Sequence, residues 1–299
     1  MKKYNVAVLM STFNGEKYIR EQIDSLLGQK SVDINIYIRD DGSSDDTLKI
    51  LEEYKKNIRI HIIYGSNLGP TKSFWTLLMN DINADYFAFS DQDDVWFENK
   101  LLEACSKLER CEKEAMYFSN LYVVDEKLEH QSILDMTPNL NIGSALVSNR
   151  AYGCTIVINK KLCDIIKRTK STMIPQHDTK IYHIALAIGA EIYFDKKSYI
   201  LYRQHGSNVV GAKISFVKRN ISRIKRIIIY QKHERRDEAR SLLNDFGEMI
   251  SAENKYIIGR MAFPGKIDSR LKTIKDKRFR TGNKKVDRDF QISMLLKLV

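Results

Sequence analysis

Apolar and polar positions follow two different rhythms along the first third of the chain. Four short runs rich in β-branched and aromatic residues predict strands at residues 4–10, 34–38, 58–64 and 85–89. Three intervening segments repeat apolar residues at helical spacing and predict helices over residues 15–29, 44–54 and 71–81. Because parallel strands need crossover helices, the pattern predicts an α/β fold whose central, mostly parallel sheet has helices on both faces. Such sheets bind ligands at the carboxyl ends of their strands.

Charge divides the chain into two parts. Residues 1–212 carry 26 Lys and Arg against 28 Asp and Glu, whereas residues 213–299 carry 23 against 10. The whole chain has a net charge of +11, and the second part accounts for all of this excess because the first part is slightly negative. We therefore expect a near-neutral domain over residues 1–212 and a basic, mainly helical segment over residues 213–299.

The start of the basic segment has an amphipathic pattern. "ISFVKRNISRIKRIIIYQK" places Val217, Ile221, Ile224 and Ile228 on one helical face and most of its Lys and Arg elsewhere. This is typical of a helix on an anionic membrane surface, and equally of one that docks on the first domain or on a second copy of the chain. Nucleic-acid binding is not expected, because the charges come without interleaved aromatic residues or a known motif.

Nothing in the sequence resembles a secretory signal or a membrane span. Residues 2–10 hold two lysines and a short apolar run, and no later apolar run approaches the thickness of a bilayer. The four cysteines lack metal-binding spacing, so we expect reduced, mostly buried thiols. These features predict a cytoplasmic protein, peripheral at the inner face of the membrane if the basic helix binds lipid.

Three carboxylates follow the fourth predicted strand in "AFSDQDDVW". Like charges so close together each raise the cost of ionising the next, which indicates a cation. A loop at a strand end lets Asp91 and Asp93 hold Mg²⁺ or Mn²⁺ while diphosphate oxygens complete its shell. The alternative is a solvated acidic turn, which the apolar residues on both sides of the cluster make less favourable.

Polar residues also follow the first two strands. Asp40 and Asp41 end the second strand in "IRDDGSSDDT"; one carboxylate suffices to cap a helix, and the other is free to accept a hydrogen bond from a base or a ribose. Thr12 and Asn14 lie in the first strand-to-helix turn, which lacks the GxGxxG pattern of dinucleotide sites. "GPTKS", which contains Lys72, lacks the spacing of a P-loop.

Five stretches together resemble a known family: "VLMSTFNGEKYIREQIDSLLGQ", "IYIRDDGSSDDT", "NLGPTKSFWTLL", "FAFSDQDDVWFENKL" and "LYRQHGSNVVG". In this order they are similar to the family-2 inverting glycosyltransferases of the Rossmann-like GT-A fold. Within that family they most resemble the bacterial rhamnosyltransferase-like enzymes that build cell-wall and capsular polysaccharides. The resemblance covers roughly residues 4–212. It implies a nucleotide-sugar donor, a Mn²⁺ or Mg²⁺ cofactor and a single displacement with inversion.

The resemblance also implies roles for individual residues. Asp93 is expected to be the principal metal-binding carboxylate of a DxD-like motif, with Asp91 and His205 beside it and Asp94 as a less defined contributor. Trp96 is expected to be a wall of the pocket. The residues expected to bind the donor are Thr12, Asn14, Asp40, Asp41, Lys72, Asp91 and Arg203.

The expected catalytic base is Asp178 in "IPQHDTKIYHIALAIGAEIYF". Inverting transfer needs a base that takes the proton of the acceptor hydroxyl. The alternative is that Asp178 is only the N-cap of the helix that follows Pro175. The family places an acidic residue in a His-Asp or Glu-Asp pair here, which favours catalysis. Close relatives often continue with tryptophan where this chain has Thr179, so the acceptor stays open.

These residues predict an enzyme that transfers L-rhamnose from dTDP-rhamnose to a hydroxyl of a lipid-linked saccharide. UDP-hexose or UDP-N-acetylhexosamine donors fit the same residues. A non-catalytic module that binds nucleotide sugar or nucleic acid is the alternative of another class. The presence of both a DxD-like turn and a later His-Asp pair favours the enzyme.

Overall fold

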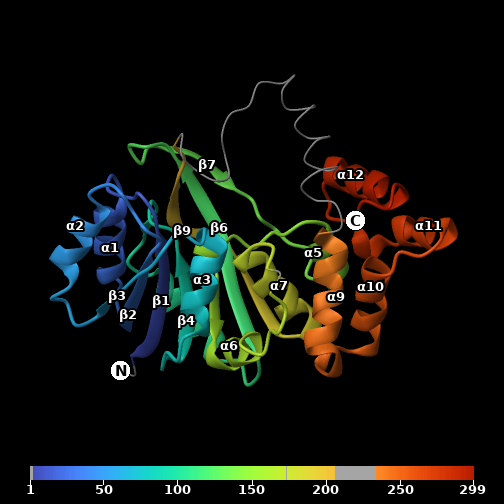
Figure 1. The fold of residues 1–299 in the computed structure, drawn as a ribbon, viewed down its shortest axis with the longest axis horizontal. Helices are drawn as coiled ribbons and strands as arrows, with labels where there is room; N and C mark the ends of the chain where they lie inside the picture. The colour runs from blue at the N-terminus through green and yellow to red at the C-terminus, as the bar shows by residue number, and fades with distance from the viewer. Residues whose placement is uncertain (1–2, 173, 206–233) are drawn as a thin grey trace.

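One mixed β-sheet forms the centre of the molecule (Figure 1). The computed structural model describes residues 3–172, 174–205 and 234–299. Within them the strands lie in the order β3-β2-β1-β4-β8-β6-β9-β5, and β7 pairs with β6. The strands are β1 (Tyr4–Thr12), β2 (Val32–Asp40), β3 (Ile60–Tyr64), β4 (Tyr86–Ser90), β5 (Val95–Trp96), β6 (Ala115–Val124), β7 (His130–Leu134), β8 (Val157–Asn159) and β9 (Glu191–Arg203).

The first four strands confirm the α/β prediction. β1 pairs in parallel with β2 and β4, and β2 pairs in parallel with β3. The crossovers contain α1 (Ile19–Leu27), α2 (Thr47–Tyr54) and α3 (Pro70–Met79). α3 begins at a proline, whose fixed φ suits the first helical position, directly after Gly69 with φ of +79°. The register places Thr12 opposite Asp40 at the carboxyl edge, where ligands of such sheets bind.

The second half of the sheet is less regular than the first. β8 is antiparallel to both β4 and β6, and β5 is antiparallel to β9, whereas β6 and β9 are parallel. The sheet is therefore parallel over its first four strands and mixed beyond them. Its helices are α4 (Lys100–Leu108), α5 (Ile142–Val147), α6 (Lys160–Ile166) and α7 (His177–Ile188), with a 3-10 turn η1 at Gly153–Thr155.

Apolar cores cover both faces of the sheet. Alternate residues of β1 belong to different cores: Val6 and Val8 face one, and Ala7 and Leu9 face the other. All four side chains are fully buried. A strand that is apolar on both faces is stable only where helices cover both faces of the sheet. The continuous apolar run of β1 therefore favours a central position in the sheet.

The described part of the basic segment, residues 234–299, is helical. It contains α9 (Glu234–Phe246), α10 (Ala252–Ala262), α11 (Ile267–Lys275) and α12 (Lys284–Leu295), with 3-10 turns at Gly247–Met249 and Lys277–Phe279. Leu242, Ile258 and Phe290 share a core with Ile184 of α7, so these helices pack on the sheet domain (Figure 1). The predicted boundary at residues 212 and 213 and the amphipathic stretch after it lie outside the described residues. No helix among the described residues has the length and apolar character needed to cross a bilayer.

Candidate active site

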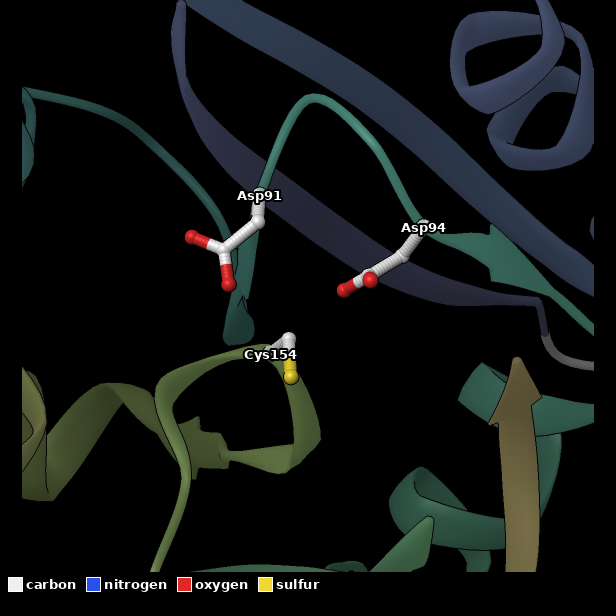
Figure 2. A group of neighbouring side chains, drawn as sticks. All are labelled: Asp91, Asp94 and Cys154. Carbon is white, nitrogen blue, oxygen red and sulfur yellow. The ribbon is translucent and has the colours of Figure 1, made fainter. Parts of the chain in front are cut away.

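The predicted acidic loop connects β4 to β5 at the carboxyl edge of the sheet. Figure 2 shows Asp91 and Asp94 on this loop with their carboxylates above Cys154 of η1. Ligand atoms of these three side chains all lie within 4.8 Å of one another. Asp93 instead has its Oδ2 2.9 Å from Nε2 of His205. The structure thus brings Asp91 together with Asp94, and Asp93 together with His205.

The loop concentrates negative charge. Desolvation, together with the charges of Asp93 and Asp178, raises the pKa of Asp91 to about 7. Burial and the charges of Asp93 and Asp91 raise the pKa of Asp94 well above its usual value. The backbone N–H of Arg203 donates to Oδ1 of Asp94, but its buried Oδ2 has no hydrogen-bond partner among the described residues. A cation bound here would remove the repulsion and satisfy that oxygen.

The chemistry of these side chains fits a hard divalent cation. Mg²⁺ and Mn²⁺ prefer carboxylate oxygens, which Asp91 and Asp94 supply, with Asp93 and His205 beside them. Burial and the nearby aspartates raise the pKa of the Cys154 thiol well above its usual value in the metal-free protein. Thiolate sulfur suits softer metals, whereas carboxylate oxygens suit Mg²⁺ and Mn²⁺. The carboxylates of the loop are therefore better suited to these ions than Cys154 is.

Two residues at the site escaped the sequence analysis. Cys154 reaches it from η1, far from the loop in sequence, so no local spacing signals it. Lys100 is buried behind the loop, with its Nζ 3.4 Å from the ring centroid of Trp96. Burial lowers the pKa of Lys100 to about 7. Trp96 is itself buried, and its ring contacts the side chain of Lys100.

The loop is fastened to the end of β1 by Gln92. Its Oε1 accepts hydrogen bonds from Oγ1 of Thr12 (2.6 Å) and the backbone N–H of Phe13 (2.8 Å). Gly15 makes this contact possible, because a Cβ there would lie 2.4 Å from Oε1 of Gln92. Asn14, with φ of +49°, accepts a hydrogen bond from the backbone N–H of Ser44. The predicted donor-binding residues Thr12 and Asn14 therefore lie at the edge of the site, each with an internal partner.

Asp40 and Asp41 are both buried and fully engaged. Asp40 accepts hydrogen bonds from the backbone N–H groups of Gly42 (3.0 Å) and Ser43 (2.9 Å) and so closes the turn after β2. Asp41 pairs with the buried guanidinium of Arg39 and accepts the backbone N–H groups of Leu68 (2.9 Å) and Gly69 (2.7 Å). The two carboxylates thus hold the loops at this edge, and their contact with a donor stays a prediction.

Arg203, at the end of β9, is bonded to the acidic loop from behind. Its Nε donates to the backbone carbonyl of Asp93 at 2.8 Å, and its Nη1 donates to that of Glu126 at 2.6 Å. It also pairs with Glu21, and its Cζ lies 4.6 Å from the ring centroid of Tyr18. The loop is therefore held from both sides. The predicted contact of Arg203 with phosphate stays a prediction, as does that of Lys72, which is exposed on the first turn of α3.

Asp178 lies in the first turn of α7 but is not its N-cap. The N-cap is Gln176, whose side chain makes no capping hydrogen bond, so the N-cap alternative for Asp178 is wrong. Oδ2 of Asp178 accepts the backbone N–H of Gly153 at 3.2 Å. Gly153 directly precedes Cys154, whose Sγ lies within 4.8 Å of ligand atoms of Asp91 and Asp94, so this hydrogen bond places Asp178 beside the acidic loop.

The neighbouring His177 has a packing role. Its ring stacks on Phe74 with centroids 4.1 Å apart, and burial lowers its pKa, which keeps it neutral. A Cβ at Gly153 would lie 2.6 Å from Nε2 of His177, so only glycine lets η1 approach α7 this closely. This approach brings the Gly153 N–H to Asp178 and Cys154 to the acidic loop.

Comparisons with known proteins identify the family and the fold of the chain. Residues 7–160 match the family model "Glycosyl transferase family 2". The dTDP-rhamnosyl transferase RfbG of Shigella flexneri is 35% identical over 219 residues, covering 69% of this chain and 75% of that protein. The UDP-Glc:alpha-D-GlcNAc-diphosphoundecaprenol beta-1,3-glucosyltransferase WfaP of Escherichia coli is 23% identical over 229 residues, covering 76% of this chain and 88% of that protein.

Solved structures share the fold at low sequence identity. S. aureus TarS 1-349 in complex with UDP-GlcNAc aligns with a TM-score of 0.63 at 16% identity, covering 98% of this chain and 88% of that one. The mannosyltransferase PcManGT from Pyrobaculum calidifontis, in complex with GDP-Man and Mn²⁺, aligns with a TM-score of 0.51 at 11% identity, covering 100% and 86%. Together with the family model and the relative from Shigella, these likenesses establish that the chain belongs to glycosyl transferase family 2 and has the GT-A fold.

Proposed function

We propose that this glycosyltransferase moves L-rhamnose from dTDP-rhamnose to a hydroxyl of a lipid-linked saccharide, with inversion. The observation that supports the proposal most strongly is that Asp178 is hydrogen-bonded to Gly153, next to Cys154, whose Sγ lies within 4.8 Å of the carboxylates of Asp91 and Asp94. The name of the Shigella relative supports the donor, and that of the E. coli relative supports a diphosphoundecaprenol-linked acceptor. Polysaccharide synthesis is the process in which such a transfer takes place.

The residues divide the chemistry between them. Asp178 takes the proton of the acceptor hydroxyl as that oxygen attacks the anomeric carbon. The N–H of Gly153 orients the Asp178 carboxylate by donating to its Oδ2. Asp91 and Asp94, with Asp93 and His205 beside them, hold the divalent cation. When bound, Mn²⁺ or Mg²⁺ supplies positive charge that stabilises the departing diphosphate.

The basic segment is proposed to place the enzyme at an anionic membrane surface, where its acceptor lies. The sequence of residues 213–299 has 13 more basic than acidic residues, which supports attraction to anionic lipids. The alternative is that the same residues form the interface of a homodimer. In that case two copies of the chain should associate in the absence of lipid.

The proposal is tested by incubating the full chain with Mn²⁺ and separate nucleotide sugars, using a polyprenyl-diphosphate disaccharide as acceptor. We expect product from dTDP-rhamnose, with the anomeric configuration inverted in its NMR spectrum. Product from UDP-glucose or a UDP-N-acetylhexosamine, with none from dTDP-rhamnose, would overturn the rhamnose assignment but would still support glycosyl transfer. Nucleotide-sugar binding without transfer to any acceptor would support a non-catalytic module.

A further inference from the structure

A cavity of about 410 Å³ lies among the C-terminal helices, and its lining includes none of the strand-end carboxylates. Arg236 and Arg240 reach it from α9, Phe263 and Lys266 from the loop between α10 and α11, and Lys297 from the end of the chain. We call these five residues the basic cup. Four of the five are cations, and they come from three places that are far apart in the sequence.

The cations of the basic cup outnumber its internal anions. Asp237 lies 3.5 Å from both Nε of Arg236 and Nη1 of Arg240, so one carboxylate serves two arginines. Nε of Arg236 is buried and makes no hydrogen bond to any described residue. Within the described part of the chain, Lys266 and Lys297 make no ion pair. A surplus of like charge around one cavity is unfavourable, and a bound anion would relieve it.

The arrangement of the cup suits a phosphate group. Arg240 is held in place by a hydrogen bond from its Nε to the carbonyl of Ala262 (3.1 Å) and by Phe263, whose ring centroid lies 5.4 Å from its Cζ. Arginine held in this way presents its remaining N–H groups as a fixed fork, which matches phosphate oxygens. Lys266 and Lys297 are exposed and add positive charge at the mouth.

Exposed apolar side chains lie in the cup, next to it in the sequence, and on the helices α11 and α12. Phe263 in the cup is 62% exposed, Leu296 beside Lys297 is 61% exposed, and Ile267 beside Lys266 is 46% exposed. Leu271 of α11 and Leu295 of α12 are exposed as well. A free phosphate or nucleotide would gain nothing from these groups, whereas a lipid surface offers phosphate to the cations and acyl chains to the apolar groups.

We propose that the basic cup and these exposed apolar residues form a docking site for the phosphate-bearing surface of an anionic lipid bilayer. In Figure 1, α11 and α12 lie at the opposite end of the long axis from α1 and α2, so docking leaves the other end free. The inference rests on the proposed function and deepens it, because it assigns the proposed membrane attachment of the basic segment to these particular residues. Membrane binding and sugar transfer are measured in separate experiments, so one proposal can be disproved while the other stands.

The test is flotation of the full chain with phosphatidylcholine vesicles, with and without phosphatidylglycerol. We expect flotation only with phosphatidylglycerol. Neutralising two exposed cup residues, in Lys266→Gln with Lys297→Gln, should weaken vesicle binding roughly tenfold, because each cation near the surface contributes attraction. The matched control is Lys49→Gln with Lys56→Gln, which makes the same charge change at exposed positions on and just after α2 and should bind like wild type.

A second variant pair separates lipid from other occupants. Phe263→Ser with Leu296→Ser keeps every charge and should also weaken vesicle binding, with an unchanged melting curve and unchanged transfer to a water-soluble acceptor. Equal flotation of the cup variant and the control would overturn the proposal. Binding of pyrophosphate without vesicle binding would overturn it in favour of a free-anion site. A lipid-free dimer that Phe263→Ser dissociates would overturn it in favour of a second copy of the chain.

Discussion

Two charged clusters, to each of which α7 contributes side chains, differ in how their charges are balanced. Towards α9, Lys180 is fully buried and its Nζ lies 3.0 Å from Glu238 and 2.7 Å from Ser241, while Nδ1 of His183 lies 3.3 Å from Glu238. Burial alone would raise the pKa of Glu238, but the hydrogen bond with His183 and the charge of Lys180 hold it below its usual value. This cluster is complete without a ligand.

The acidic loop has the opposite balance. Asp91, Asp93, Asp94 and Asp178 lie together, and the first and third of them have raised pKa values. One buried lysine, Lys100, lies behind them, and burial lowers its pKa to about 7. The comparison teaches that this chain pairs its charges where they only stabilise the fold. It leaves like charges together where we propose that a cation and a substrate bind.

Removing the proposed base should have the largest effect. Asp178→Asn keeps an oxygen to accept the N–H of Gly153 but does not take a proton. We expect transfer to fall by a factor on the order of 10²–10⁴, with donor affinity and melting temperature unchanged. The measurement is the rate of transfer to a lipid-linked acceptor, and Asp81→Asn, an exposed aspartate after α3, is the control. Near wild-type transfer would show that another carboxylate is the base.

Breaking the paired cluster should cost folding stability. Lys180→Met leaves the buried Glu238 without its lysine partner, and we expect a loss of about 3–5 kcal/mol in the free energy of unfolding. Combining it with Glu238→Leu should cost much less than the sum of the single changes, because no buried charge is left unpaired. Denaturant unfolding of the double-mutant cycle measures this coupling. Additive losses would contradict the view that these residues act as a pair.

Removing one carboxylate from the acidic loop should leave the folding stability of the metal-free protein unchanged or raise it. Asp94→Asn keeps an acceptor for the N–H of Arg203 and removes a repelled carboxylate, so the metal-free protein should be as stable as wild type or more stable. The same denaturant series as for Lys180→Met gives a direct contrast. A loss as large as that of Lys180→Met would remove the distinction between the two clusters.

The raised pKa of Asp91 gives a smaller effect that depends on pH. Its pKa is about 7 in the folded protein and about 3.9 in an unfolded chain. Between these values the folded state binds more protons than the unfolded state, so the stability of the metal-free protein falls as pH rises from about 4 to about 7. Asp91→Asn removes this fall and should gain on the order of 1–2 kcal/mol at neutral pH, allowing for partial solvent screening. Thermal melts in chelator across this range measure it; parallel pH profiles would contradict the raised pKa.

The sequence predicted what depends on local patterns. Apolar runs located the first four strands, and polar residues at their ends located Thr12, Asp40 and Asp91 at one edge of the sheet. The partners that come from distant parts of the chain were not predictable. Glu238 lies 58 residues beyond Lys180, and Cys154 reaches the acidic loop only because Gly153 lets η1 pack against α7. Helical spacing shows that a side chain faces inward, but not which charge it meets there.

The central claim is that the acidic loop holds a divalent cation that binds the nucleotide diphosphate. It is tested most directly by calorimetry with dTDP and with UDP, with and without Mn²⁺, above the pKa of about 7 of Asp91. We predict that Mn²⁺ strongly increases nucleotide affinity in wild type and in the Asp81→Asn control. Asp91→Asn and Asp93→Asn should each lose that increase while keeping the melting curve of a folded protein. An unchanged effect of Mn²⁺ in both loop variants would contradict the claim.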